Sequence, residues 1–203
     1  MVSFIPNIYL RYCMNKMDIV EHLIPKGSGR VLDVGCGDID VAGHVYCHNR
    51  LKRKYKDVIG IDINPGRRRN TIRASASNIP FANQSIEYVV SFDVIEHIKD
   101  YSAVIKDMLR IANRRVIIIV PTTKNRFIRP ILNFLRRMLR GVDNFIFQGH
   151  YYEFYPSEVC IFKGYRYSCK VITINYPIIG ASIFHRKGLI SAGIYIFDRL
   201  KKE

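Results

Sequence analysis

The sequence predicts a doubly wound α/β domain, with a mostly parallel, seven-stranded sheet and an antiparallel strand at its C-terminal edge. Two observations predict this fold class. Segments that resemble strands and helices alternate through the first two thirds of the chain, as they do where helices connect parallel strands. The strand-like segments are also continuously apolar, which is typical of a sheet covered by helices on both faces. We therefore expect residues 1–203 to form a single domain.

The first part of the chain shows this alternation most clearly. Apolar residues recur at helical spacing over 8–23, which predicts an opening amphipathic helix. A second helix is predicted over 41–56, and the Lys and Arg residues of its C-terminal half suit a solvated last turn. Short apolar runs between the helices are expected to be buried strands. These strands are 30–34, 58–63, 71–75 and 86–92, and a third helix is predicted over 94–112.

The last third of the chain is more basic and less regular. The strand expected over 115–121 is the most hydrophobic of all, and the basic residues 124–140 after it are expected to be partly helical. We interpret the region of about 122–150 as a basic, lid-like insertion. A short helix is predicted over 156–163. Two further strands, 169–175 and 192–197, are expected to form an antiparallel pair.

The composition limits the kinds of partner and location. The chain holds 32 Lys or Arg against 17 Asp or Glu, and the resulting charge of +15 attracts polyanions without choosing among nucleic acid, anionic lipid and small acidic molecules. The longest purely apolar run is 116–120, far shorter than the about 20 residues that a membrane-spanning helix needs. The apolar residues 1–10 lack a small-residue cleavage pattern. A cytoplasmic protein is expected, either free or in peripheral contact with a membrane.

Two segments have the chemistry of a nucleoside-type site. The first strand ends in VLDVGCG, where Gly35 and Gly37 allow a tight turn and a close approach of the backbone to a ligand. The helix that follows would present free N–H groups to that ligand. The second segment ends in Asp62, whose carboxylate can accept hydrogen bonds from two ribose hydroxyls. Each segment alone also fits an ordinary strand-to-helix turn.

The loop favours S-adenosylmethionine (SAM) over a dinucleotide. The third glycine of the dinucleotide fingerprint is replaced by Asp40, three residues after Gly37. Asp38 also lies in this loop. Carboxylates would repel a pyrophosphate, whereas the sulfonium and the amino group of SAM are cationic.

Two further runs make the pattern specific. They are ASASNIPF at 74–81 and SIEYVVSFDVIEHI at 85–98, and they follow the glycine loop and Asp62 in order. Together these motifs resemble the class I SAM-dependent methyltransferases, most closely the type 11 branch that includes the ubiquinone and menaquinone biosynthesis enzymes. The resemblance covers nearly the whole chain. It implies a Rossmann-like methyltransferase fold.

The resemblance also implies roles for residues at the methionine end of SAM. Asp33 would contact the ammonium group, directly or through water. Phe92 and Asp93, at the end of the fourth strand, would wall the methyl-donor site. The residues that would underlie the methionine part are those of the glycine loop: Gly35, Cys36 and Gly37.

The adenosine end of SAM would be held by the next two strand ends. Asp62 would bind the ribose hydroxyls, and Ile63 would pack on the adenine ring. Ser75 and Ala76 would lie at the adenine edge. The family usually has an acid at the position of Ser75, and a hydroxyl is a neutral acceptor in its place.

A catalytic base is needed only if the methyl acceptor must lose a proton, because the enzyme otherwise supplies mainly orientation. His97 and His150 are the candidates, since a histidine pKa suits proton transfer near neutral pH. The alternative for His97 is a structural bond to the backbone. Asp93 and Glu96 could join the two histidines in a divalent-metal site, but many type 11 relatives have the same letters without a metal. We expect no metal.

The sequence is compatible with three hypotheses, two about the methyl acceptor and one about binding without methyl transfer. The first is an O or N atom of a small molecule, lipidic or anionic. The second is RNA or protein bound by the basic residues 108–142, which include nine Lys or Arg and no acid, and by the Arg cluster 67–69. The same region also fits a membrane-surface helix or a lid over the substrate. The third is SAM binding without catalysis, because Ser75 and Ile39 depart from the family pattern.

Overall fold

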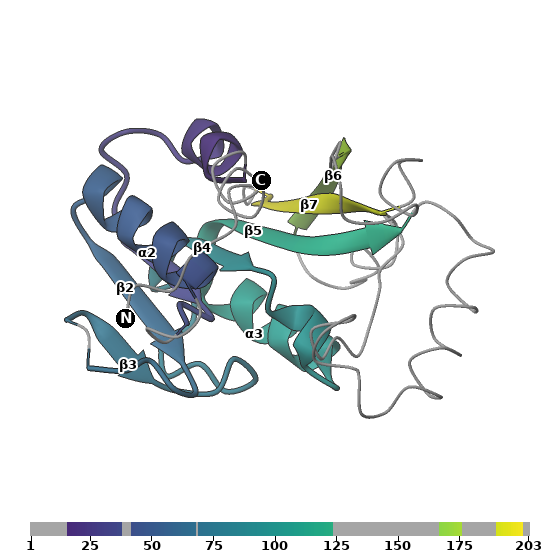
Figure 1. Ribbon diagram of the computed structural model, residues 1–203. Helices are drawn as coiled ribbons and strands as arrows, with labels where there is room; N and C mark the ends of the chain where they lie inside the picture. Colours follow the sequence, from purple (N-terminus) through teal and green to yellow (C-terminus); the bar gives the residue numbers. More distant parts are fainter. Residues whose placement is uncertain (1–15, 38–41, 68, 124–166, 176–189, 201–203) are drawn as a thin grey trace, which may run out of the picture.

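The computed structural model describes residues 16–37, 42–67, 69–123, 167–175 and 190–200, and the structure is discussed for these residues. They form one seven-stranded sheet in the order β3-β2-β1-β4-β5-β7-β6 (Figure 1). The strands are β1 (Val31–Val34), β2 (Val58–Asp62), β3 (Thr71–Arg73), β4 (Ile86–Phe92), β5 (Ala112–Thr123), β6 (Tyr167–Asn175) and β7 (Ile190–Arg199). The helices are α2 (Ala42–Lys54), the short 3-10 helix η1 (Ile95–His97) and α3 (Tyr101–Ile111), and residues 16–23 are also helical.

The sheet is parallel from β3 to β5, whereas β7 runs antiparallel to both β5 and β6. The chain places β2 and β3 on one side of β1, and β4 and β5 on the other. The strand order therefore reverses between β1 and β4. In open α/β sheets, ligands bind in the crevice outside the carboxyl ends of the strands at such a reversal. The predicted fold is confirmed, including the antiparallel C-terminal strands.

Both faces of the sheet are covered, as the continuous apolar strands predicted. Residues 16–23 and α2 cover one face, and α3 covers the other (Figure 1). Alternate residues of each strand point to opposite faces, so that Val31 packs under α2 while Leu32 packs toward α3. The apolar run 116–120 in β5 is fully buried. Two apolar layers therefore hold the central strands in place.

The predicted helix over 94–112 is wrong in one respect. It is divided into η1 and α3, because Asp100 caps α3 by accepting a hydrogen bond from the Ala103 N–H at 3.1 Å. Before the cap, the His97 N–H donates to the Val94 carbonyl at 3.0 Å in a 3-10 turn. β5 begins at Ala112, directly after α3 and earlier than predicted.

The other boundaries agree with the predictions within a few residues, and β4 agrees at both ends. The helices predicted over 124–140 and 156–163, the first half of the opening helix, and almost all of the lid-like insertion lie outside the described residues. The division into one domain with an insertion therefore stays a prediction. None of the described helices is long and apolar enough to cross a membrane.

Candidate functional site

The glycine loop is fixed to β2 at the carboxyl edge of the sheet. The N–H groups of Gly35 and Cys36 both donate to the Ile61 carbonyl, at 2.8 and 3.1 Å. Gly35 has a φ of 82°, and a Cβ built on it would lie 2.2 Å from a methyl group of Val94. Only glycine fits there, since both the backbone conformation and the neighbour exclude a side chain. Gly37 also adopts a positive φ, of 71°.

Asp62 joins the end of β2 to the glycine loop. One carboxylate oxygen accepts a hydrogen bond from the Gly37 N–H at 2.9 Å, and the other accepts from the Asn64 N–H at 2.9 Å. Asp62 as a whole is half-buried, so solvent reaches part of this residue. The next side chain, Ile63, is 71% exposed. A hydrogen-bonding acid therefore lies beside an apolar side chain in water, a combination that suits a ribose and a flat base.

Asp33 is placed differently, beneath the loop. Its side chain is 1% exposed, and its Oδ2 lies 2.9 Å from Nδ1 of His48 on α2, which is buried as well. Within the described residues, Asp33 Oδ1 and His48 Nε2 have no hydrogen-bond partner. The imidazole and the Cys36 thiol pack against Gly60, where an added Cβ would lie 2.7 Å from each. The buried pair thus supports the loop from below.

The predicted adenine edge lies on the loop after β3. Ser75 is exposed, and its hydroxyl accepts a hydrogen bond from the Ser77 N–H at 3.2 Å. Ala76 is half-buried against the apolar layer under α3. The end of this loop is held by Arg110 on α3, which donates to the carbonyls of Ile79 at 3.0 Å and Phe81 at 2.8 Å. The NIPF run therefore has a structural role of its own.

The end of β4 brings together three ionisable groups. Phe92 is buried, and Asp93 follows it with a φ of 51°. The Asp93 carboxylate forms an ion pair with Lys16, which is 1% exposed on helix 16–23. Glu96 is fully buried, and neither of its carboxyl oxygens has a hydrogen-bond partner within the described residues. Burial first, and the Asp93 charge second, raise the pKa of Glu96 well above its ordinary value.

Of the two candidate bases, the structure describes His97 but not His150. His97 is half-buried in η1, and its backbone N–H makes the turn to Val94 noted above. His150 lies outside the described residues. Sequence reasoning missed Lys16 and His48. Lys16 resembles an ordinary polar residue of an amphipathic helix, and the only signal for His48 is its place among apolar residues on α2.

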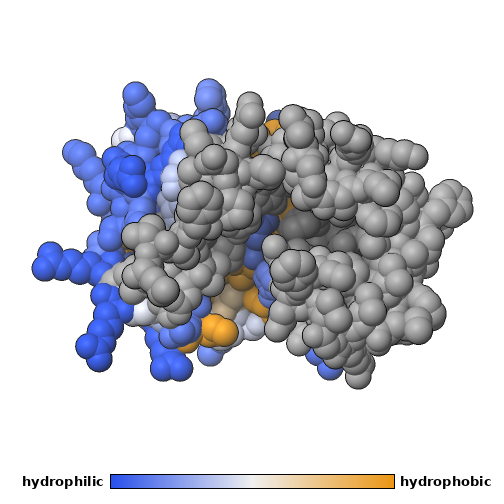
Figure 2. All heavy atoms as spheres, viewed as in Figure 1, coloured by the Kyte–Doolittle hydropathy of each residue, from blue (hydrophilic) through white to orange (hydrophobic). Residues whose placement is uncertain are grey.

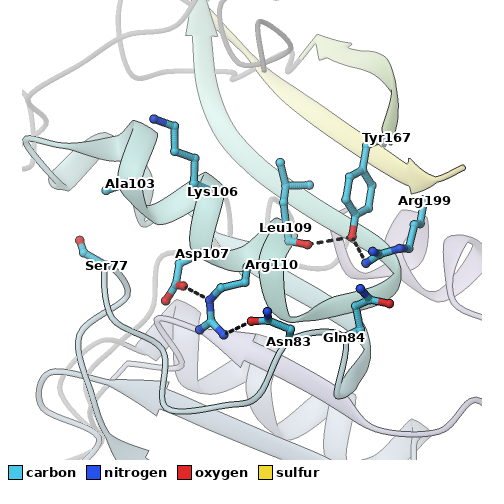
Figure 3. Close-up of a pocket in the computed structure, with 10 residues that line it drawn as sticks. All are labelled: Ser77, Asn83, Gln84, Ala103, Lys106, Asp107, Leu109, Arg110, Tyr167 and Arg199. Atoms are coloured by element: carbon cyan, nitrogen blue, oxygen red, sulfur yellow. Dashed lines mark hydrogen bonds and ion pairs between the residues drawn. The ribbon is translucent and has the colours of Figure 1, made fainter. Parts of the chain in front are cut away.

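A separate hollow of about 490 Å³ lies along α3 (Figure 3). None of the residues around it belongs to the glycine loop or to the ends of β2 and β4. Its polar groups bind one another: Arg110 pairs with Asp107 at 2.6 Å, and the Tyr167 hydroxyl accepts from Arg199 at 3.2 Å. Ser77 belongs to the loop after β3, so the hollow adjoins the predicted adenine edge but does not include the glycine loop.

The strand order β3-β2-β1-β4-β5-β7-β6, with β7 antiparallel to both of its neighbours, matches the Rossmann-like fold of the class I methyltransferases. Residues 9–158 match the family model described as "Methyltransferase domain". The chain belongs to that family. It is accordingly a SAM-dependent methyltransferase, as the sequence motifs predicted, and the type 11 resemblance is compatible with this family. No curated protein matches the sequence.

Solved structures share the fold at low sequence identity. The YcgJ protein from Bacillus subtilis is 14% identical with a TM-score of 0.61, over 95% of this chain and 100% of that one. Haemonchus contortus phosphoethanolamine N-methyltransferase 2, in complex with phosphomonomethylethanolamine and S-adenosylhomocysteine, is 15% identical with a TM-score of 0.62, over 92% of this chain and 53% of that one. The small RNA methyltransferase HEN1 is 16% identical with a TM-score of 0.60, over 100% of this chain and 26% of that one.

Proposed function

We propose that the protein transfers the methyl group of SAM to an O or N atom of a small anionic molecule, either lipidic or water-soluble. The observation that supports the donor site most directly is the Asp62 carboxylate, bonded to Gly37 and followed by the exposed Ile63. The charge of +15 supports an anionic acceptor. The Haemonchus enzyme shows that this fold accommodates a small phosphate-bearing molecule.

The residues at the carboxyl edge fit SAM on chemical grounds. SAM supplies an electrophilic methyl group on a sulfonium. Asp33 and Asp93 provide negative charge at the end where its cationic groups would lie, and Gly35 and Gly37 leave room for close approach. The other residues proposed to contact SAM are Cys36, Asp62, Ile63, Ser75, Ala76 and Phe92.

If the acceptor must lose a proton, His97 or His150 would take it. His97 follows the buried Glu96 in η1, close along the chain to Asp93. A histidine base predicts a methylation rate that rises with pH through the range in which the imidazole loses its proton. An acceptor that reacts without losing a proton would give a rate independent of pH in this range.

Labelling tests the acceptor class. Purified protein is incubated with tritiated SAM and host extract, and the extract is then separated into lipid, small-molecule, RNA and protein fractions. We expect label in the lipid or small-molecule fraction. The Asp62→Ala variant serves as the background control. Label confined to RNA or protein would contradict the small-molecule acceptor, and no label in any fraction would contradict catalysis.

RNA is the second candidate acceptor, and a surface on α2 and β3 favours it. Two cations of α2 are neutralised by helix 16–23: Arg50 pairs with Asp18 at 2.5 Å, and Lys54 pairs with Glu21 at 2.8 Å. The cations on the outer side are exposed and form no ion pair within the described residues. They are Lys52, Arg53, Lys56, Arg67, Arg69 and Arg73.

Within this surface, the Lys52 ammonium donates to the Arg69 carbonyl at 3.2 Å, which joins α2 to the segment before β3. Figure 2 shows hydrophilic residues gathered over the side of the molecule where α2 and β3 lie. If the surface binds RNA phosphates, affinity should fall steeply with salt, by a slope of about 0.7 per phosphate contact for single strands. Binding that does not respond to salt would remove RNA as a candidate.

A further inference from the structure

Lys16 is unusual because it is the only Lys or Arg buried among the described residues. It lies on helix 16–23 and is 1% exposed, and its partner is Asp93 at the end of β4, far away in the sequence. A lysine is buried as an ion only when a charged or hydrogen-bonding partner compensates for the lost water. The ion pair thus fixes the N-terminal helix to the edge at which the strand order reverses.

Asp93 is held on the backbone side as well. Its N–H donates to the Ile119 carbonyl at 2.8 Å, and its φ of 51° is unusual for a residue with a side chain. Such a conformation persists only where the surrounding structure fixes it. The Asp93 side chain, which is 14% exposed, is therefore held both through its backbone and through its ion pair with Lys16.

Glu96 completes the cluster without adding charge. It is fully buried, and burial favours its protonated, neutral form. Lys16 contributes one positive charge and Asp93 one negative charge, so the cluster is neutral as a whole. Without Lys16, the negative charge of Asp93 would be less compensated at the edge of the sheet. Lys16 therefore weakens the attraction between the Asp93 carboxylate and a cation bound at this edge of the sheet.

We propose that Lys16 is a positioning residue of the methyl-donor site, which holds the Asp93 carboxylate and moderates its attraction for the sulfonium of SAM. The proposal rests on the proposed placement of SAM at this edge. The product, S-adenosylhomocysteine (SAH), lacks the sulfonium charge. Asp93 therefore favours SAM over SAH, and Lys16 opposes that preference. The balance keeps the donor from being bound too tightly before the reaction.

The test is the affinity of the full chain for SAM and for SAH, measured separately by calorimetry at pH 8. The quantity of interest is the ratio of the SAH dissociation constant to the SAM dissociation constant. We expect Lys16→Met to raise this ratio by at least about fivefold and Asp93→Asn to lower it by at least a similar factor, which is the effect of one unit charge at contact distance when water screens it fully. Lys16→Arg, which keeps the charge, should leave the ratio near the wild-type value.

Lys26 provides a matched control, because it is exposed and has no partner within the described residues. Lys26→Met removes the same charge and should leave the ratio unchanged. An unchanged ratio in both Lys16→Met and Asp93→Asn would overturn the proposal, and so would an equal shift in Lys26→Met. If Lys16→Met does not fold, Asp93→Asn and Lys16→Arg decide the question. Wild-type protein that binds neither ligand would instead contradict the proposed donor site.

Discussion

Asp33 and Asp62 both lie near the carboxyl ends of neighbouring parallel strands, Asp33 one residue before the end of β1 and Asp62 at the end of β2, but their surroundings differ. Asp33 is buried and bound to an imidazole, whereas Asp62 is half-buried and bound to two backbone N–H groups at the loop surface. The sequence predicts SAM contacts for both. Solvent reaches Asp62 but not Asp33, so Asp62 is the stronger candidate for a ligand contact, whereas Asp33 supports the loop from beneath.

The largest effect is expected from Asp62→Ala. The substitution removes two charge-assisted hydrogen bonds, each worth about 1.5–3 kcal/mol, and frees the Gly37 end of the loop. SAM affinity should fall by more than about 100-fold, as measured by calorimetry. Asp57→Ala is the matched control, since Asp57 precedes the same strand and pairs with exposed Arg30. Near-wild-type affinity in Asp62→Ala would remove Asp62 from the donor site.

His48→Leu should affect folding more than binding. It leaves Asp33 buried without its partner, and breaking one side of a buried pair costs about 3–5 kcal/mol. Urea unfolding should show this loss in the free energy of unfolding. SAM affinity of the folded protein should change by less than about tenfold. The reverse result, intact stability with lost binding, would place Asp33 in the same role as Asp62.

Glu96→Gln should change how stability depends on pH. The pKa of Glu96 is raised in the folded state, so the folded protein holds a proton that the unfolded chain releases above about pH 4.5. The stability of the wild type should therefore fall as pH rises from about 4.5 toward the raised pKa, by up to about 1.4 kcal/mol per pH unit from this group. Glutamine cannot release a proton and should lack this dependence. Parallel stability curves of the two proteins from pH 4.5 to 8 would contradict a neutral Glu96.

The smallest effect is expected from Ile63→Ser. The side chain is already 71% exposed, so the free energy of unfolding should stay within about 0.5 kcal/mol of wild type. SAM affinity should fall about fivefold, because roughly half of the isoleucine's burial energy would be lost with the base. Ile72→Ser is a suitable control, since Ile72 on β3 is 38% exposed. Equal affinities for both variants and wild type would exclude packing of Ile63 on adenine.

The sequence was most informative where apolar runs have clear ends. β4 was predicted at both ends because polar residues bound its apolar run. The helix over 94–112 was predicted as continuous because the apolar spacing continues through η1 and α3. That spacing does not reveal the positive φ of Asp93, which follows the end of β4, or the Asp100 cap, at which α3 begins. Local hydrogen bonds decided these boundaries.

The site was predictable to the extent that its chemistry is local in sequence. The glycine loop and Asp62 follow from strand ends and residue types, and the structure joins them through Gly37. Lys16 and His48 were not predictable, because each gains its meaning from a carboxylate on another element of the fold. Ion pairs between separate elements depend on tertiary packing, and the spacing of apolar residues in the sequence does not show which elements pack together.

The position of β7 has a consequence for synthesis of the chain. β7 lies between β5 and β6, and pairs along its length with both, although it follows β6 in the sequence. While the ribosome has made β6 but not residues 190–199, β5 has an unpaired edge and β6 has no strand to join. Such edges recruit other chains. The nascent protein therefore passes through an aggregation-prone interval that ends only when β7 emerges.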